Sequence, residues 1–239
     1  MKYFILTHSS NSKVVGRAAS LATVLEDGVM GAYLDFSAFY RTLVSKEVVL
    51  PKYQLARSAK KTDLLARITG LTLPFYGVIS EKFLRILNDG FKYPESQFLP
   101  FSIVDASGKP LEYFLFHQYV FMDEYIDFTK SKFSRTTYDF SQNPPAKSVV
   151  AFQVNDAREL RSKIENQKGT VSTQALFLDK KNIVHDFFAI SRPYCWIVNE
   201  HLAERIRQEN ITGVVLIPLS QGADFSVEDI VTMAKKFDQ

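Results

Sequence analysis

The chain has 239 residues, of which 46% are hydrophobic and 23% are charged, and its formal net charge is +3. This composition is typical of a globular protein, and the length suffices for one large domain or two small ones. No apolar run approaches the ~20 residues of a membrane-spanning helix, and the first residues lack the apolar segment of a signal peptide. A single cysteine, Cys195, excludes an intrachain disulfide. We therefore expect a cytoplasmic protein that does not engage a membrane.

The first 70 residues predict one strand and two helices. Tyr3–Thr7 is apolar enough for an edge strand or an early strand, and residues 14–25 carry apolar side chains at helical spacing. Residues 61–70 (KTDLLARITG) predict a short helix, with Thr62 as its N-cap and Gly70 just beyond its end.

Two similar strand–helix units follow, 119 residues apart: PFYGVISEKFLRIL from Pro74 and PYCWIVNEHLAERI from Pro193. In each unit, an aromatic and β-branched strand leads to a polar residue suited to an N-cap, Ser80 or Asn199. The glutamate that comes next favours a helix start because the helix dipole is positive there. The shared order indicates a possible internal duplication.

Between and after these units, turn signals separate further elements. Residues 98–121 predict a β-hairpin that turns at 106–110, and residues 175–191 predict a second hairpin that turns at 179–182. Helices are predicted within 154–169 and from Val227 to Phe237, where Ser226 would be the N-cap.

The paired prolines Pro144 and Pro145, in YDFSQNPPAKS, disfavour both a helix and an inner strand, and they indicate a linker. We therefore expect an α+β fold of two similar subdomains, residues 1–143 and 146–239. Each would be a mostly antiparallel sheet with short helices, and the two would pack tightly together.

Few residues suggest chemistry. Carboxylates gather only at Asp123, Glu124 and Asp127, where they could serve as an acid–base pair or a metal site, alone or together with His117. The same residues are also typical of a strand end followed by a capped turn. No phosphate-binding loop or nucleophile motif is present, and Cys195 sits within a strand, as a small buried hydrophobe would. We expect no enzyme activity, cofactor or metal, and keep a hydrolase or metal-dependent enzyme as the alternative.

Positive charge is concentrated near the N-terminus, where residues 1–70 hold ten basic and five acidic side chains. A basic stripe can bind nucleic acid, but few aromatic residues that could stack on bases lie among these cations. A solvated helix face is the simpler interpretation of these charges. A nucleic-acid-binding module remains as an alternative function, beside the hydrolase or metal-dependent enzyme. Its candidate residues are Lys52, Arg57, Lys60, Lys61 and Arg67.

From about Lys61 to Leu219, the order of several short motifs resembles a family of bacterial immunity proteins, the DUF1629 or Imm11 group of polymorphic toxin systems. The matching segments are an Asp before a short element (Asp63), the unit Val78-Ile79-Ser80-Glu81, the segment Tyr125-Ile126-Asp127 with Ser131, and the strand entry Ile211-Thr212-Gly213. The second unit has Asn199 where serine is usual in the family.

The resemblance implies a protein that binds and neutralises a cognate toxin or secreted effector, by covering its active site or locking its conformation. Because loops carry function more often than core strands do, we expect the toxin-binding surface to include Asp123, Glu124, Lys130, Lys132 and Arg135.

Overall fold

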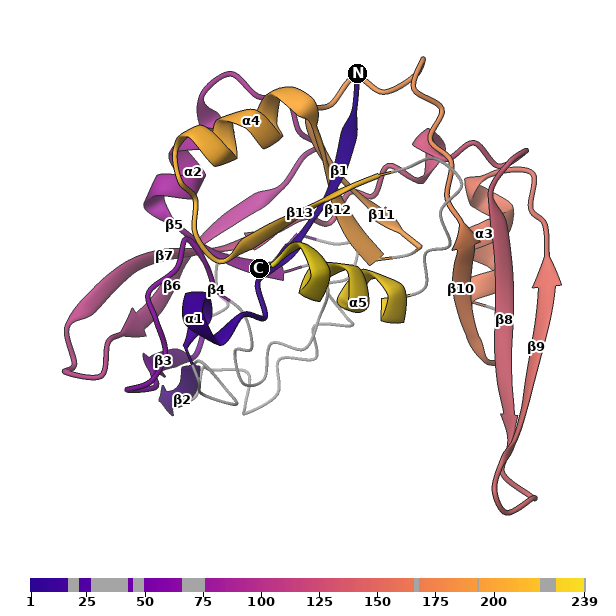
Figure 1. The fold of residues 1–239 in the computed structure, drawn as a ribbon, viewed down its shortest axis with the longest axis horizontal. Helices are drawn as coiled ribbons and strands as arrows, with labels where there is room; N and C mark the ends of the chain where they lie inside the picture. The colour runs from indigo at the N-terminus through magenta and orange to yellow at the C-terminus, as the bar shows by residue number, and fades with distance from the viewer. Residues whose placement is uncertain are drawn as a thin grey trace.

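The computed structural model describes residues 1–16, 22–26, 43–44, 50–65, 76–165, 168–192, 194–219 and 227–238 (Figure 1). Helices occur together with one four-stranded, one six-stranded and one three-stranded sheet, and nearly all strand pairs are antiparallel. The predicted α+β class is confirmed.

The four-stranded sheet lies at the centre of the molecule, in the order β11-β12-β1-β13. Its strands are β11 (Phe187–Ser191), β12 (Tyr194–Asn199), β1 (Tyr3–His8) and β13 (Val214–Pro218). Each neighbouring pair is antiparallel. The predicted N-terminal strand is thus an inner strand, hydrogen-bonded on both sides by strands from the end of the chain.

The six-stranded sheet has the order β2-β3-β6-β7-β5-β4. Its strands are β2 (Ala22–Glu26), β3 (Lys52–Leu55), β6 (Gln97–Val104), β7 (Pro110–His117), β5 (Tyr76–Ser80) and β4 (Leu64–Leu65). β3 and β6 pair in parallel, and the other pairs are antiparallel. β6 and β7 form the first predicted hairpin, in which the Asp105 carboxylate accepts hydrogen bonds from the N–H groups of Ser107 and Lys109 across the turn.

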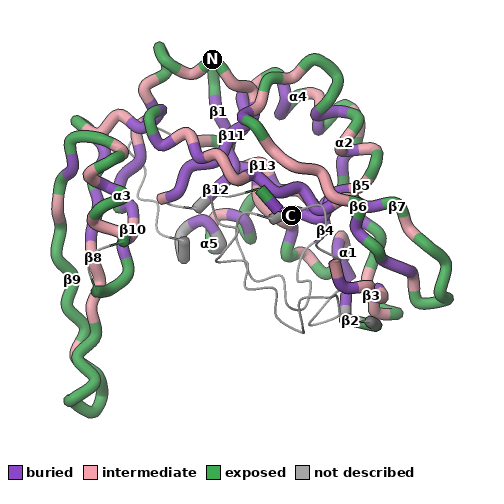
Figure 2. The backbone as a smooth tube through the Cα atoms, turned by 180° about the vertical axis from the view of Figure 1, so that it is seen from behind, coloured by how far each residue is buried: buried purple, intermediate pink, exposed green. Residues whose placement is uncertain are grey.

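Each face of the four-stranded sheet borders its own hydrophobic core, because successive residues of a strand point to opposite faces. Phe4 and Leu6 of β1 belong to a core shared with the six-stranded sheet and with α2 (Glu81–Asn88) and α4 (Glu200–Gln208). Tyr3 and Ile5 belong to a second core on the other face. α5 (Val227–Phe237) contributes buried Ile230 and Ala234 to this second core, as its predicted apolar stripe requires. Figure 2 shows the buried strands in the interior.

The third sheet projects from the body (Figure 1). Its order is β10-β8-β9, built from β8 (Lys132–Asp139), β9 (Ala146–Phe152) and β10 (Thr170–Ala175). The predicted helix α3 (Ala157–Glu165) packs beside β10. We call residues 132–175 the arm.

Three predictions of local structure were wrong. Helix α1 (Ser12–Val15) is only four residues long: it ends at Gly16, whose φ of 94° does not continue a helix, and Ala22–Glu26 forms β2. Leu64–Leu65 forms β4 against β5 in place of a helix, while residues 66–70 lie outside the described part of the chain. The segment 175–191 is not a hairpin, because β10 pairs with β8 and β11 pairs with β12.

The division into subdomains 1–143 and 146–239 does not describe these sheets. Pro144 and Pro145 lie in the turn that joins β8 to β9, two strands paired over seven residues. β1 also pairs with β12 and β13 from the other end of the chain. The prolines break the strand at a hairpin turn, so the predicted linker connects strands within one sheet.

The two strand–helix units do form, and their caps match. The Ser80 hydroxyl accepts a hydrogen bond from the Phe83 N–H at 3.2 Å, and the Asn199 side-chain oxygen accepts one from the Leu202 N–H at 3.0 Å. Each cap residue also bonds an aspartate: Ser80 donates to Asp63, and Asn199 donates to Asp186, through both backbone and side chain.

Each of these aspartates also bonds the loop that follows the helix of the other unit. The Thr212 N–H donates to Oδ2 of Asp63 at 2.8 Å, and the Lys92 N–H donates to Oδ2 of Asp186 at 2.7 Å. The contacts of the two units are therefore equivalent and reciprocal. Internal duplication is one origin of such an arrangement and stays a hypothesis.

Candidate protein-binding surface

The β8–β9 hairpin carries an unusual concentration of exposed apolar side chains. Among the described residues, nine large hydrophobic side chains are exposed, and four of them lie on this hairpin: Tyr138 (51%), Phe140 (79%), Val149 (51%) and Val150 (60%). Isolated exposed hydrophobic residues are normal, but a cluster of them marks an interaction site. The hairpin is therefore the strongest candidate for a surface that contacts another macromolecule.

β9 is exposed on both of its faces. Residues 147–151 are all exposed (Figure 2), and adjacent strand residues point to opposite sides of a sheet. The exposure of both Val149 and Val150 thus means that neither face of β9 is covered at these residues, although α3 packs beside β10 in the same arm. Both the apolar side chains of β9 and the backbone of its outer edge are therefore accessible to a binding partner.

The base of the arm is fixed by aromatic packing. Phe133 is fully buried and stacks between Phe128 and Phe152, with ring centroids 6.2 and 6.1 Å away. The Arg135 guanidinium lies 5.3 Å from the centre of the Phe152 ring and donates a hydrogen bond to the Lys163 carbonyl. These contacts tie β8, β9 and α3 together, so the hairpin projects from a packed support.

The arm is positively charged. It contains seven basic and four acidic side chains, a net charge of +3 over 44 residues. Lys132 and Lys147 are both exposed, and they share one face of the sheet because Lys147 pairs with Tyr138, six residues after Lys132 on β8. An acidic surface is the electrostatic complement of this face.

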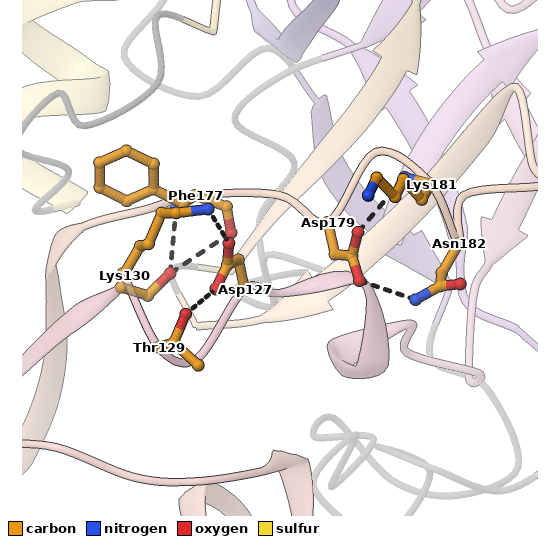
Figure 3. A network of polar contacts seen from close by, with 8 residues as sticks. Asp127, Thr129, Lys130, Phe177, Asp179, Lys181 and Asn182 are labelled. Atoms are coloured by element: carbon orange, nitrogen blue, oxygen red, sulfur yellow. Dashed lines mark hydrogen bonds and ion pairs between the residues drawn. The ribbon is translucent and has the colours of Figure 1, made fainter.

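Next to the base of the arm, two turns lie side by side (Figure 3). In the first, the Asp127 carboxylate accepts hydrogen bonds from the Thr129 hydroxyl and from Lys130 Nζ, both at 2.6 Å. The hydrogen bond from Lys130 is the main reason why the pKa of Asp127 is lowered, and the Thr129 hydroxyl adds to it. In the second turn, the Asp179 carboxylate accepts a bond from the Asn182 side chain.

A short backbone bridge joins the two turns. The Asp127 N–H donates to the Phe177 carbonyl at 2.9 Å, and the Asp179 N–H donates to the Tyr125 carbonyl at 2.8 Å. Ser131 also bonds Phe177, accepting a hydrogen bond from its N–H at 3.0 Å. Asp127 and Ser131 of the Tyr-Ile-Asp…Ser motif therefore serve a structural role here, as the capped-turn interpretation expected.

The predicted toxin-binding residues do not form one surface. Asp123 is 1% exposed, and its carboxylate accepts hydrogen bonds from the N–H and the hydroxyl of Ser191, each at 2.7 Å. It thus connects helix η2 (Asp123–Tyr125) to β11 and is not part of an exposed patch, contrary to the prediction.

The other four predicted residues are accessible to different degrees. Glu124, Lys130 and Lys132 are exposed, and Arg135 is half-buried against Phe152. Only Lys132 and Arg135 belong to the arm. The sequence analysis missed Tyr138, Phe140, Val149 and Val150, since the prolines suggested a linker. The run Val149-Val150-Ala151, without a polar alternation, was the available signal.

The residues of the enzyme alternative are dispersed over different structural roles. Asp123 is buried on Ser191, Asp127 closes its own turn, and His117 is buried at the end of β7, with Nδ1 3.2 Å from the Gln97 side-chain oxygen. In the part of the chain that the structure describes, no three His, Cys, Asp or Glu side chains are placed to hold a metal ion. Cys195 is buried, as predicted, and burial is the main cause of its raised pKa.

The basic residues near the N-terminus are not arranged on a helix face. Lys52 is in β3, Lys60 Nζ donates to the Lys13 carbonyl, and Lys61 pairs with Asp105 at 3.0 Å. Arg57 is exposed, and Arg67 lies outside the described residues. The predicted solvated helix face was therefore wrong for the described residues of this segment, which are built around β3.

A polar groove lies between α2 and α4. Arg205 lies 3.2 Å from carboxylate oxygens of both Asp89 and Glu209, and Lys82 Nζ donates to the Glu209 carbonyl. Arg205 and Lys82 thus each bond a residue at the end of the other helix, while Arg85 pairs with Glu81 within α2. The groove therefore has a structural explanation.

No helix among the described residues is long and apolar enough to cross a membrane. No known protein-family model matches the chain, and its sequence matches no curated protein. The functional assignment therefore depends on the arm and on the order of the sequence motifs.

Proposed function

We propose that this chain is an immunity protein of the kind its motif order resembles, which binds and neutralises a cognate bacterial toxin or effector. The single observation that carries the proposal is the arm: a projecting hairpin with four exposed apolar side chains, a packed base and a net positive charge. Such a combination of apolar contact area and surrounding charge is typical of surfaces that recognise proteins.

In this proposal the chain works in the cytoplasm and makes or breaks no covalent bond. Inhibition comes from occupying the active site of the toxin or fixing an inactive conformation. A stable complex of this type buries about 800 Å² on each partner. The exposed face of the arm, together with the neighbouring Glu124 and Lys130, would supply this contact surface.

The experiment is co-expression with the toxin domain encoded next to this chain's gene. Growth should be restored, and the two proteins should elute together in size-exclusion chromatography. Continued growth arrest, with both proteins soluble and eluting separately, would refute the proposal. A broad hydrolase screen on the isolated chain tests the enzyme alternative, and reproducible turnover abolished by Asp127→Ala would favour that alternative.

A further inference from the structure

We propose that β9 is a docking strand: an extended, acidic segment of the partner protein pairs with its outer edge and adds a fourth strand to the sheet β10-β8-β9. This inference rests on the proposed function for the identity of the partner. It specifies how the partner is held, which the proposed function leaves open.

The first argument is that the outer edge of β9 has no neighbouring strand. β9 is the terminal strand of its sheet and, among the described residues, pairs only with β8. An edge strand presents unpaired backbone N–H and C=O groups, which another strand can satisfy. The edge faces away from the body of the molecule (Figure 1), so nothing among the described elements blocks the approach of a partner.

The second argument is that β9 lacks the features that usually protect an edge. Protected edges carry prolines, bulges or several charges. β9 has no proline, one charged residue at its start (Lys147), and continuous pairing with β8 from Phe133–Phe152 to Asp139–Ala146 without a register shift. By comparison, the pairing of β10 with β8 contains a shift near Thr173. The edge of β9 is therefore regular, apolar and open.

The third argument identifies the partner as acidic. The arm has a net charge of +3, and Lys147 lies on β9 itself, directly beside an added strand. A second copy of this chain would bring two arms of like charge together, which weakens association. An acidic strand instead gains favourable electrostatic attraction. Val149 and Val150, which point to opposite faces, would each contact an apolar side chain of that strand.

The test compares two matched double variants in binding to the toxin domain encoded beside this chain's gene. Lys147→Glu with Val149→Glu changes the charge and the apolar surface of β9. Lys109→Glu with Leu43→Glu makes the same lysine change and a comparable apolar-to-glutamate change at two exposed positions outside the arm and outside the two neighbouring turns. All four side chains are exposed, so both variants should retain the fold.

We expect the β9 variant to bind at least about tenfold more weakly, because it alters the centre of the interface, while the control binds like the wild type. Hydrogen exchange on the complex should show new protection of β9 amides. If the wild type binds and protects cells but the two variants bind equally and β9 gains no protection, the docking strand is refuted and the proposed function stands.

Two further outcomes would also overturn the inference. Protection of β9 that rises with the concentration of this chain alone would show that a second copy occupies the edge. Absence of any complex with the wild-type chain would refute the docking strand and the proposed function together.

Discussion

Asp63 and Thr212 are 149 positions apart in the sequence, yet the Thr212 N–H and hydroxyl both donate to Oδ2 of Asp63, at 2.8 and 2.9 Å. The other carboxylate oxygen accepts a hydrogen bond from the Ser80 hydroxyl at 2.7 Å. One side chain thus joins β4, the cap of α2 and the entry to β13. Because β4 and β13 belong to different sheets, Asp63 helps to fix how those sheets meet.

Replacing Asp63 by alanine should lower the free energy of unfolding by about 2 kcal/mol, because a charged acceptor of three hydrogen bonds is lost. Denaturant unfolding followed by the fluorescence of Trp196, the single tryptophan, measures this. Asp139→Ala is a matched control, since Asp139 closes only a local turn through Ser141.

A double-mutant cycle of Asp63→Ala and Thr212→Val measures the coupling free energy between these two side chains. The losses of Asp63→Ala and Thr212→Val should combine to less than their sum, because both remove the same interaction. Fully additive losses would contradict the assigned contact.

Three of the motif segments that resemble the immunity family meet at this contact. Ser80 and Thr212 each donate hydrogen bonds to the Asp63 carboxylate, and Gly213 follows with a φ of 80°. A Cβ at Gly213 would lie 2.3 Å from the Leu64 carbonyl oxygen. The order of these motifs therefore has an architectural cause. The residue pattern of the motifs correctly predicted the helix caps Ser80 and Asn199. It could not show that the segments of Asp63, Ser80 and Thr212 contact one another in the fold.

Asp186→Ala should destabilise the protein about as much as Asp63→Ala, by about 2 kcal/mol, because Asp186 accepts hydrogen bonds from the Asn199 side chain and the Lys92 N–H. The effects of the two substitutions should add within about 0.5 kcal/mol, since the hydrogen-bonded partners of the two aspartates are different residues. The same denaturant assay tests both points. If Asp186→Ala leaves the free energy of unfolding almost unchanged, the two units share the same hydrogen-bond geometry, but their aspartates do not contribute equally to stability.

Gly77, in β5, packs against the ring of Trp196. A Cβ at this position would lie 2.2 Å from the Trp196 ring, and Trp196 is 5% exposed within the core. Gly77→Ala should cost about 1–3 kcal/mol, because the packed ring has little room to move, and it should shift the emission of Trp196. Gly77→Ala should cost less in a Trp196→Phe background, because the atoms nearest to the added Cβ belong to the six-membered ring of the indole. If Gly77→Ala has the same stability and the same emission spectrum as the wild type, the side chains around Trp196 can rearrange to accommodate the added methyl group.

The sequence predicted what depends on neighbouring residues and failed where distant pairing decides. Ser80 and Asn199 are local caps, and both were predicted. Leu64 and Leu65 are helix formers by composition, but pairing with Ile79 and Val78 places them in a strand. For the candidate site, Lys132 and Arg135 were expected in a loop and instead lie in β8, and the exposed hairpin was not predicted. Its prolines are typical of a linker, and only the pairing of β8 with β9 shows that they occupy a turn.

Stability should decrease on acidification because of His8, at the end of β1, whose ring lies 6.5 Å from that of Trp196. Burial lowers the pKa of His8 from 6.5 to about 4. The unfolded chain therefore takes up this proton first, so the contribution of neutral His8 is complete above pH 6.5 and is lost as the pH falls through about 4. A loss of about 3 kcal/mol over this range is expected, at about 1.4 kcal/mol per pKa unit, and denaturant unfolding at several pH values measures it. His8→Gln, which cannot titrate, should flatten the profile, whereas His201→Gln, at an exposed position of α4, should leave it unchanged. If the profiles of wild type and His8→Gln coincide between pH 4 and 6.5, burial of His8 does not govern the acid sensitivity of this fold.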